Sequence, residues 1–590
     1  MEKVTALRKL MTERGLDAYV IPSGDPHASE YITDHWRTRQ WLSGFTGSAG
    51  LVVVTQTEAG LWTDGRYFIQ AVQELEGTGI DLFKSGEPDV PKYSAFLTEK
   101  LPSNGRLGFD GRTLPSEDFE TLKKALKDKN ITFAYQEDLI GKLWGERPPM
   151  PTCPAFEHEP QFAGKCASEK LADVRAKMAE KKITAYLVTA LDDIAWLLNI
   201  RGNDILRTPV VYSYVLITEK DAHVFIDPGK IKTIAAKLTS LGFTLHGYDA
   251  LPKLLSKLPT NGKLYYNSTK TNTLLAEAIP KGYKSLRKSE ADIIPLLKAV
   301  KSETEISNIK NAFIKEGAVL VQFLKWLDES IGKTELTESD VAEKLTALRK
   351  AQPHYLEDSF ETISAYGANA ALMHYRFEGK GAVLRPEGFL LVDTGGQYLD
   401  GTTDTTRTIP LGDVTDEMKR DYTLVLKGHI ALARARFLDG TTGHALDVLA
   451  RQPLWQAGIN YRCGTGHGIG YCLGVHEGPQ SISPRRENAV ALVPGMLLSN
   501  EPGVYKEGLY GIRTENILLV TTEIENEDGI FLGFTPVTYC PVDLSVVDKA
   551  LLSEDEREYL NSYHKKTYEA LAPLLNEEEC AWLANVTKAI

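Results

Sequence analysis

Several features that mark particular classes of protein are scarce or missing in this chain of 590 residues. Its six cysteines are sparse and form no C-x-x-C pair, so we expect free thiols in a reducing compartment instead of a disulfide framework. No stretch approaches the roughly 18 apolar residues of a membrane-spanning helix. The net charge of −12 argues against a nucleic-acid-binding protein, because phosphate contacts need a basic face.

Signals for secretion and for phosphate binding are also missing. The first residues space Val4, Leu7 and Met11 as on an amphipathic helix and contain no uninterrupted apolar run, so we expect no signal peptide. GTGHGIG (464–470) superficially resembles a phosphate-binding loop, but it lacks the Lys-Ser/Thr ending. With 43% hydrophobic and 25% charged residues, the composition indicates a globular protein, and we expect it in the cytoplasm.

The front half of the chain contains the same unit twice. W-L-x-x-F-x-G at 41–47 returns as W-L-x-x-I-x-G at 196–202, and the apolar run at 51–64 matches the run at 214–227. Each copy alternates helical and strand-like patterns, which is typical of an α/β sheet covered by helices. A proline-rich linker at 146–160 separates the copies, and we expect it to hold no regular structure.

Capping signals mark the start of the last domain and of its tail. Ser302 and Glu305 form an S-x-x-E capping box that opens a long amphipathic helix to about Ile331. Another such box, Ser553 to Glu556, opens a helical tail that we expect to pack on the last domain or to form a subunit contact. The prediction is an α/β (α+β) protein with domains at 1–150, 151–301 and 302–590, the last with a helical extension over about 549–590.

Two aspartates follow or lie within strand-like runs of the last domain. Phe389 to Val392 form an apolar strand that ends at Asp393, and a β-branched return strand carries Asp404. Two carboxylates brought close together repel each other unless a cation lies between them. The alternative is a pair of exposed aspartates in a turn.

Three further residues extend this pattern. His467 lies among glycines that let the backbone approach a crowded centre, although a structural histidine is the alternative. Glu501 ends an apolar run. Glu515 lies within a strand-like run at 510–522, on the same face as Arg513, with which an ion pair is the alternative.

Taken together, these carboxylates and the single imidazole suit a site for two metal ions. Oxygen-rich ligation with one imidazole and no thiolate favours Mn²⁺, with Co²⁺, Zn²⁺ or Fe²⁺ as alternatives. Two close cations can lower the pKa of a water and stabilise a tetrahedral intermediate. The pattern therefore predicts a dinuclear hydrolase.

Motifs along essentially the whole chain carry a family resemblance. They include EYITDHWRTRQWLSGFTGSAG, LKAVKSETEI, LMHY, DTGGQYLDGTTDTTRT, GTGHGIG, VHEGP, SNEPGVY and GIRTEN. With them the sequence resembles the Xaa-Pro aminopeptidases of the pita-bread metallopeptidase superfamily, most closely their long, three-domain cytosolic form. The resemblance implies two duplicated creatinase-like N-terminal domains, a pita-bread catalytic domain and a homodimer.

The resemblance also implies roles for the candidate ligands. The family's five metal ligands match Asp393, Asp404, His467, Glu501 and Glu515. Asp404 and Glu515 would bridge two divalent metal ions, Asp393 would complete one ion, and His467 with Glu501 would complete the other. Glu501 would also carry a proton to the leaving proline nitrogen.

Four more residues receive roles in the same way. His374 and His476 match histidines that orient the substrate and stabilise its developing oxyanion. Arg513 is placed to orient Asp393. Cys463 departs from the family, which usually has a histidine there in the substrate pocket. Because no metal ligand is lost, we still expect activity, and a packing thiol is the alternative to a reactive one.

The expected activity is hydrolysis of the bond before proline in peptides with proline at the second position, with no membrane or nucleic-acid partner. A prolidase that accepts only Xaa-Pro dipeptides would share the same ligands. A non-catalytic pita-bread binding protein typically loses ligands that this chain retains. Creatinase-like amidinohydrolases share the fold without the metal set, so they are disfavoured on the same ground.

Overall fold

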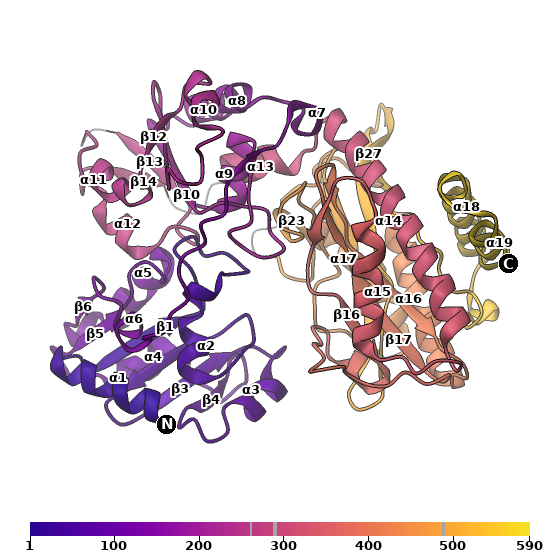
Figure 1. The fold of residues 1–590 in the computed structure, drawn as a ribbon, viewed down its shortest axis with the longest axis horizontal. Helices are drawn as coiled ribbons and strands as arrows, with labels where there is room; N and C mark the ends of the chain where they lie inside the picture. Colours follow the sequence, from indigo (N-terminus) through magenta and orange to yellow (C-terminus); the bar gives the residue numbers. More distant parts are fainter. Residues whose placement is uncertain (260–261, 287–291, 487–489) are drawn as a thin grey trace. The chain divides into compact units, whose positions relative to one another are not determined.

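A computed structural model describes residues 1–259, 262–286, 292–486 and 490–590. Contacts within the chain divide it into two compact units, which consist of residues 1–157 with 165–294, and of residues 158–164 with 295–590. Figure 1 shows the first unit in indigo to magenta and the second mostly in pink to yellow. Both sheets of the duplicated half belong to the first unit, so the boundaries near 150 and 301 stay predictions of a finer division.

The first unit contains two six-stranded sheets of the same topology. Their strand orders are β4-β3-β2-β1-β5-β6 and β12-β11-β10-β8-β13-β14. In each sheet the first strand of the copy is antiparallel to one neighbour and parallel to the other. The matching strands are β1 (Ala18–Pro22) and β8 (Ala185–Val188), β2 (Leu51–Thr55) and β10 (Ser213–Thr218), and β5 (Arg106–Phe109) and β13 (Lys263–Tyr266). The duplication predicted from the repeated motifs is confirmed.

Alternating side chains of β1 bury both faces of its sheet. Tyr19 and Ile21 pack with Leu7 of α1 (Glu2–Glu13). Ala18 and Val20 face the other way and pack with apolar residues of α4 (Tyr93–Lys100) and α5 (Ser116–Ala125). Because successive strand residues point to opposite faces, one short apolar strand serves two helical layers (Figure 1).

The prediction of no regular structure at 146–160 is wrong at one end of that segment. Phe156–Glu157 form β7, which pairs with β9 (Ile200–Arg201), and α7 (Pro160–Ala163) begins at the last proline. Proline is tolerated at the first position of a helix, where its missing N–H has no partner to lose. The rest of the proline-rich segment is irregular, as predicted.

Long helices frame the second unit, and both capping boxes are confirmed. Ser302 and Ser553 each accept a hydrogen bond from the third backbone N–H of the helix that they open. The C-terminal helices both contact α14, so the tail packs on this unit. The helices are α14 (Glu303–Ser330), α15 (Glu338–Lys350), α16 (Asp416–Ala433), α17 (Gly443–Gln456), α18 (Glu554–Leu571) and α19 (Glu577–Val586).

Antiparallel strands of the second unit pack against these helices. A three-stranded sheet has the order β16-β17-β20, and a six-stranded sheet has the order β21-β28-β27-β24-β22-β23. Leu390 and Val392 of β17 share a core with α14 and α15, and Leu498 of β24 shares another with Leu432 of α16. The strands that matter for the site are β16 (Ile363–Tyr366), β17 (Phe389–Thr394), β20 (Thr405–Pro410), β22 (Gly466–Gly468), β24 (Leu497–Asn500), β26 (Tyr510–Arg513) and β27 (Asn516–Asn526). Among the described helices, none has the length and apolar character needed to cross a membrane.

Candidate metal centre and active site

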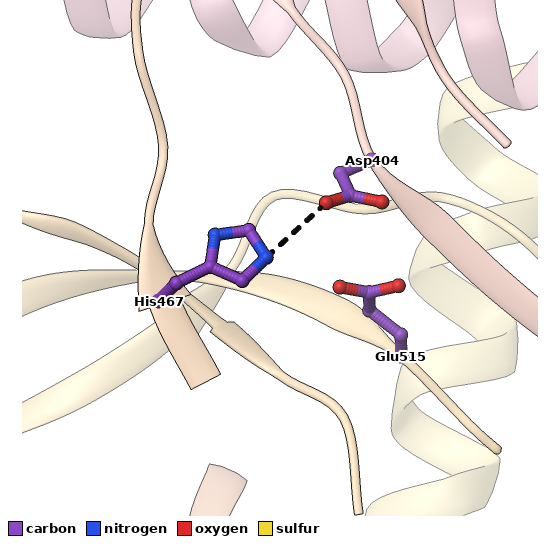
Figure 2. A group of neighbouring side chains, drawn as sticks. All are labelled: Asp404, His467 and Glu515. Carbon is purple, nitrogen blue, oxygen red and sulfur yellow. Dashed lines mark ion pairs between the residues drawn. The ribbon is translucent and has the colours of Figure 1, made fainter. Parts of the chain in front are cut away.

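Three of the five candidate ligands converge in the second unit. Ligand atoms of Asp404, His467 and Glu515 all lie within 4.8 Å of one another. Figure 2 shows the His467 ring directed at Asp404, with Nε2 of His467 3.5 Å from Oδ2 of Asp404. Asp404 directly precedes β20, His467 lies in β22, and Glu515 lies between β26 and β27. Residues from three separate segments of the chain therefore form one cluster.

The backbone around His467 explains why glycines surround it. A Cβ atom on Gly466 would lie 1.9 Å from the carbonyl oxygen of Ser499, and one on Gly468 would lie 2.1 Å from that of Glu477. Nδ1 of His467 lies 3.0 Å from the carbonyl oxygen of Gly468. A carbonyl can only accept, so this hydrogen bond places a proton on Nδ1, and Nε2 is the ring nitrogen that faces the carboxylates. Nε2 is therefore the atom that would bind a metal ion.

Glu501 and Asp393 lie around the same centre. Oε1 of Glu501 is 3.5 Å from Nε2 of His467 and accepts a hydrogen bond from the Ser499 hydroxyl at 3.2 Å. Oδ2 of Asp393 accepts a 2.5 Å hydrogen bond from Nη2 of Arg513. Oδ1 of Asp393 is buried and has no hydrogen-bond partner within the described residues. A bound cation would satisfy this oxygen, so the donor set fits a metal centre.

The carboxylates of the cluster are crowded together and largely buried. Asp393, Asp404 and Glu515 are 9%, 4% and 1% exposed. Burial and then repulsion from neighbouring carboxylates raise the pKa of Asp404 and of Glu515 well above the usual range. Burial also raises the pKa of Glu501 to about 7, although Arg513 opposes the shift. One guanidinium cannot neutralise four clustered carboxylates, whereas divalent cations can.

These observations decide between the alternatives left by the sequence. Asp393 and Asp404 are buried, so they are not exposed turn aspartates. Arg513 donates to Asp393 and lies 4.0 Å from Glu501, and it forms no salt bridge with Glu515 among the described residues. The carboxylate of Glu515 instead accepts a 2.7 Å hydrogen bond from the Thr406 hydroxyl.

The predicted continuous strand over residues 510–522 is wrong. The chain leaves β26 at Arg513 and enters β27 at Asn516, because β26 pairs with β25 (Gly503–Lys506) whereas β27 pairs with β24. Glu515 therefore lies where the chain passes from one sheet to another. There its backbone N–H donates to the carbonyl of Thr406 at 3.1 Å, which brings its side chain beside Asp404. Asp404 likewise precedes its return strand instead of lying on it.

The two candidate substrate histidines lie at the surface. His476 is exposed, and its ring centroid is 4.3 Å from that of His467 in an edge-on contact. His374 is exposed and follows the short helix η4 (Gly367–Ala371). A Cβ atom on Gly511 of β26 would lie 1.8 Å from the carbonyl oxygen of Ala370, so η4 lies directly on the strand that leads to Arg513.

Cys463 lies beside an apolar cluster that includes Tyr461 and Val504. Burial, and secondarily Glu501, raise the pKa of its thiol to about 12. A thiol with so high a pKa is protonated at neutral pH and is a poor nucleophile. The structure therefore agrees with a packing thiol.

Sequence reasoning missed three residues that hold the ligands in place. The Thr406 hydroxyl donates to Glu515 and accepts a hydrogen bond from Nε of Arg513 at 3.2 Å. The Ser499 hydroxyl accepts from the backbone N–H of His467 at 2.9 Å, and the Tyr505 hydroxyl accepts from Arg513 at 2.8 Å. Thr406 and Ser499 each lie two residues from a ligand, and this spacing was the available signal.

We expect Arg513→Lys to lower the affinity for Mn²⁺ by about 10- to 100-fold, the usual effect of losing a partner that orients a metal ligand. Lysine keeps the charge but cannot reproduce the fork that joins Asp393, Thr406 and Tyr505. Calorimetric titration of metal-free protein with Mn²⁺ measures the change. Arg434→Lys, at the exposed residue that directly follows α16, is the matched control. An affinity equal to that of the unaltered protein would contradict the role of Arg513.

Four family models match consecutive parts of the chain. Two models described as Creatinase/Prolidase N-terminal domain match residues 3–143 and 146–305. Metallopeptidase family M24 matches residues 307–522, and the C-terminal region of that family matches residues 530–590. Fold and site together define a metallopeptidase with duplicated creatinase-like N-terminal domains and a pita-bread catalytic domain.

Individual relatives show to which family of these metallopeptidases the chain belongs. A probable Xaa-Pro aminopeptidase P of Laccaria bicolor is 40% identical over 599 residues, which cover 99% of this chain and 92% of the relative. The X-prolyl aminopeptidase of Caenorhabditis elegans, described as a cytosolic enzyme with a di-nuclear active site, has a TM-score of 0.94 and 35% identity and covers 100% of this chain and 99% of its own. An Xaa-Pro dipeptidase from Bacillus anthracis, with a TM-score of 0.52 and 25% identity, covers 99% of its own chain but 64% of this one. The chain belongs to the Xaa-Pro aminopeptidase P family.

Proposed function

We propose that this protein is an aminopeptidase that releases the first residue from peptides with proline at the second position. Two divalent metal ions, preferably Mn²⁺, serve the reaction, and the protein acts in the cytoplasm as a homodimer. The observation that carries the proposal is the convergence of buried carboxylates and one imidazole at one centre. The full-length match to Xaa-Pro aminopeptidases supports the substrate class over that of a dipeptidase.

The site residues divide into metal ligands and groups that act on the substrate. The proposed ligands are Asp393, Asp404, His467, Glu501 and Glu515. When bound, the ions polarise the scissile carbonyl and make water a strong nucleophile at neutral pH. The proline nitrogen must gain a proton as it leaves, and we assign the delivery of that proton to Glu501.

Two histidines and one arginine complete the proposed machinery. His476, edge-on to His467, and His374 donate hydrogen bonds to the substrate oxygen on which negative charge develops. Arg513 keeps Asp393 in position through its 2.5 Å hydrogen bond. Cys463 lines the pocket where the family usually has a histidine.

Three peptides separate this function from its alternatives. With Mn²⁺ present, we expect Arg-Pro-Pro to release arginine, while Arg-Ala-Ala stays intact. Cleavage of the dipeptide Arg-Pro but not of Arg-Pro-Pro would show a prolidase. No cleavage of either proline peptide with Mn²⁺, Co²⁺, Zn²⁺ or Fe²⁺ would show a binding protein. Mass spectrometry of the products distinguishes these results.

We expect Cys463→His to keep or raise kcat/KM for Arg-Pro-Pro. The change leaves every proposed ligand in place and restores a stronger hydrogen-bond donor than a thiol. Cys580→His, in the C-terminal tail, controls for adding a histidine elsewhere. A large loss confined to Cys463→His would show that the thiol has a role of its own.

A further inference from the structure

A buried carboxylate outside the metal centre holds the loop that carries His374. Glu338, the first residue of α15, is 0% exposed. Within the described residues no salt bridge involves it. Its two oxygens instead accept four hydrogen bonds, all from the segment 366–382. The donors are the Tyr366 N–H (2.8 Å) and Asn369 Nδ2 (2.9 Å) to Oε1, and the Tyr375 hydroxyl and the Ala382 N–H (both 2.8 Å) to Oε2.

The loop packs closely against the side chain and the backbone of Glu338. A Cβ atom on Gly381, whose φ is +69°, would meet Oε2 of Glu338 at 2.4 Å, so the loop passes too close for any side chain there. The Glu338 N–H donates to the carbonyl of Ala382 and the Ser339 N–H to that of Lys380, each at 3.1 Å. A buried anion costs stability unless it is fully hydrogen-bonded, and here every bond that compensates it fixes one loop.

The same loop packs on strands that lead to the metal centre. It begins at Tyr366, which lies opposite Leu390 of β17, the strand that carries Asp393, and its helix η4 packs on β26, which ends at Arg513. His374 directly precedes Tyr375, whose hydroxyl also accepts a 2.9 Å hydrogen bond from Asn369. One carboxylate thus ties the beginning, the middle and the end of the loop on which His374 lies.

We propose that Glu338 is a positioning residue that sets the place of His374 for the substrate. This inference rests on the proposed function, in which His374 contacts the peptide. Glu338 holds the loop through hydrogen bonds alone and has no part in metal binding.

Limited proteolysis tests, independently of activity, whether Glu338 holds the loop. In Glu338→Gln the amide nitrogen faces donors only, so at least one pair of hydrogen bonds is lost. Because hydrogen bonds to a charged group are stronger than those between neutral groups, we expect trypsin to cut after Arg376 and Lys380 about tenfold faster or more. Glu343→Gln, the same change at an exposed position of α15, should leave the rate unaltered. Unchanged cutting in Glu338→Gln would overturn the proposal.

A double-mutant cycle tests whether Glu338 acts through His374. We expect Glu338→Gln to lower kcat/KM for Arg-Pro-Pro by about 10- to 100-fold, the cost of misplacing a catalytic group by about 1 Å, with bound Mn²⁺ unchanged. In a His374→Ala background it should have little further effect. An equal loss in both backgrounds, or a loss that follows the metal content, would overturn the proposal.

Two further outcomes can be distinguished from a failure of the proposed role of Glu338. If the unaltered protein cleaves no Xaa-Pro peptide, the proposed function fails, while the trypsin rates still decide whether Glu338 holds the loop. If Glu338→Gln does not fold, Tyr375→Phe removes one of the four hydrogen bonds beside His374. It should then show a smaller loss in the same direction, and full activity with unaltered trypsin cutting would contradict the inference.

Discussion

Replacing Asp404 by asparagine is expected to remove nearly all Xaa-Pro cleavage. Metal ions contribute several kcal/mol of charge stabilisation in the transition state, and each 1.36 kcal/mol is tenfold in rate, so we expect kcat/KM for Arg-Pro-Pro to fall by about 10²- to 10⁴-fold. Oδ2 of Asp404 lies 3.5 Å from Nε2 of His467, at the same distance as Oε1 of Glu501. Asp404 also belongs to the compact cluster of ligand atoms.

The same variant makes a second prediction about the metal-free protein. Burial, and then repulsion from Glu515 and Asp393, raise the pKa of Asp404, and a neutral amide at this position removes both costs of the charge. We expect metal-free Asp404→Asn to melt at or above the temperature of the unaltered metal-free protein. Asp413→Asn, at an exposed position shortly after β20, should change neither the peptidase activity nor the melting temperature. Full peptidase activity in Asp404→Asn would contradict the assignment.

Arg349→Met is expected to cause the largest loss of stability. Arg349 of α15 is 0% exposed and donates to Glu316 of α14 at 2.6 Å and to the Thr394 hydroxyl, directly after Asp393, at 2.8 Å. Removing one partner of a buried ion pair leaves an uncompensated charge and typically costs about 3–5 kcal/mol. The urea midpoint of the transition that unfolds the second unit should fall accordingly.

A matched double variant separates the charge from the packing. Arg349→Met leaves two carboxylates without this partner, Glu316, which is fully buried, and Asp358, which is 17% exposed. Adding Glu316→Gln to Arg349→Met removes the more deeply buried anion and should recover a large part of the loss. Arg420→Met, where an exposed arginine pairs with Asp421, controls for loss of a guanidinium at the surface. A single variant as stable as the unaltered protein, or a double variant no better than the single one, would contradict this account of Arg349.

Local signals in the sequence predicted much of the fold. The S-x-x-E boxes at Ser302 and Ser553 begin helices because each satisfies backbone donors within one helical turn. The duplicated motifs predicted two similar sheets because a repeated sequence folds by the same local rules. The proline-rich segment was only partly predicted, since the pairing of Phe156–Glu157 with a strand some forty residues later has no local signal.

The sequence indicated side chains that the structure brings together, but not how they are arranged. The apolar run around Glu515 continues through the break between β26 and β27, because both flanking strands are buried, so periodicity cannot show the change of sheet. For most of the candidate ligands, the sequence left an ordinary structural role open as an alternative. Only their proximity in the folded chain favours a shared metal centre over these separate roles. The contacts of Glu338 span 28 to 44 residues, a separation that no local pattern encodes.

The most direct test of the two-metal peptidase is titration of metal-free protein with Mn²⁺, with bound metal counted by mass spectrometry and arginine release from Arg-Pro-Pro measured in the same samples. We predict no release without metal and a rate that rises to a plateau at two bound ions per chain. Arginine release at the full rate from protein that holds no metal would contradict it.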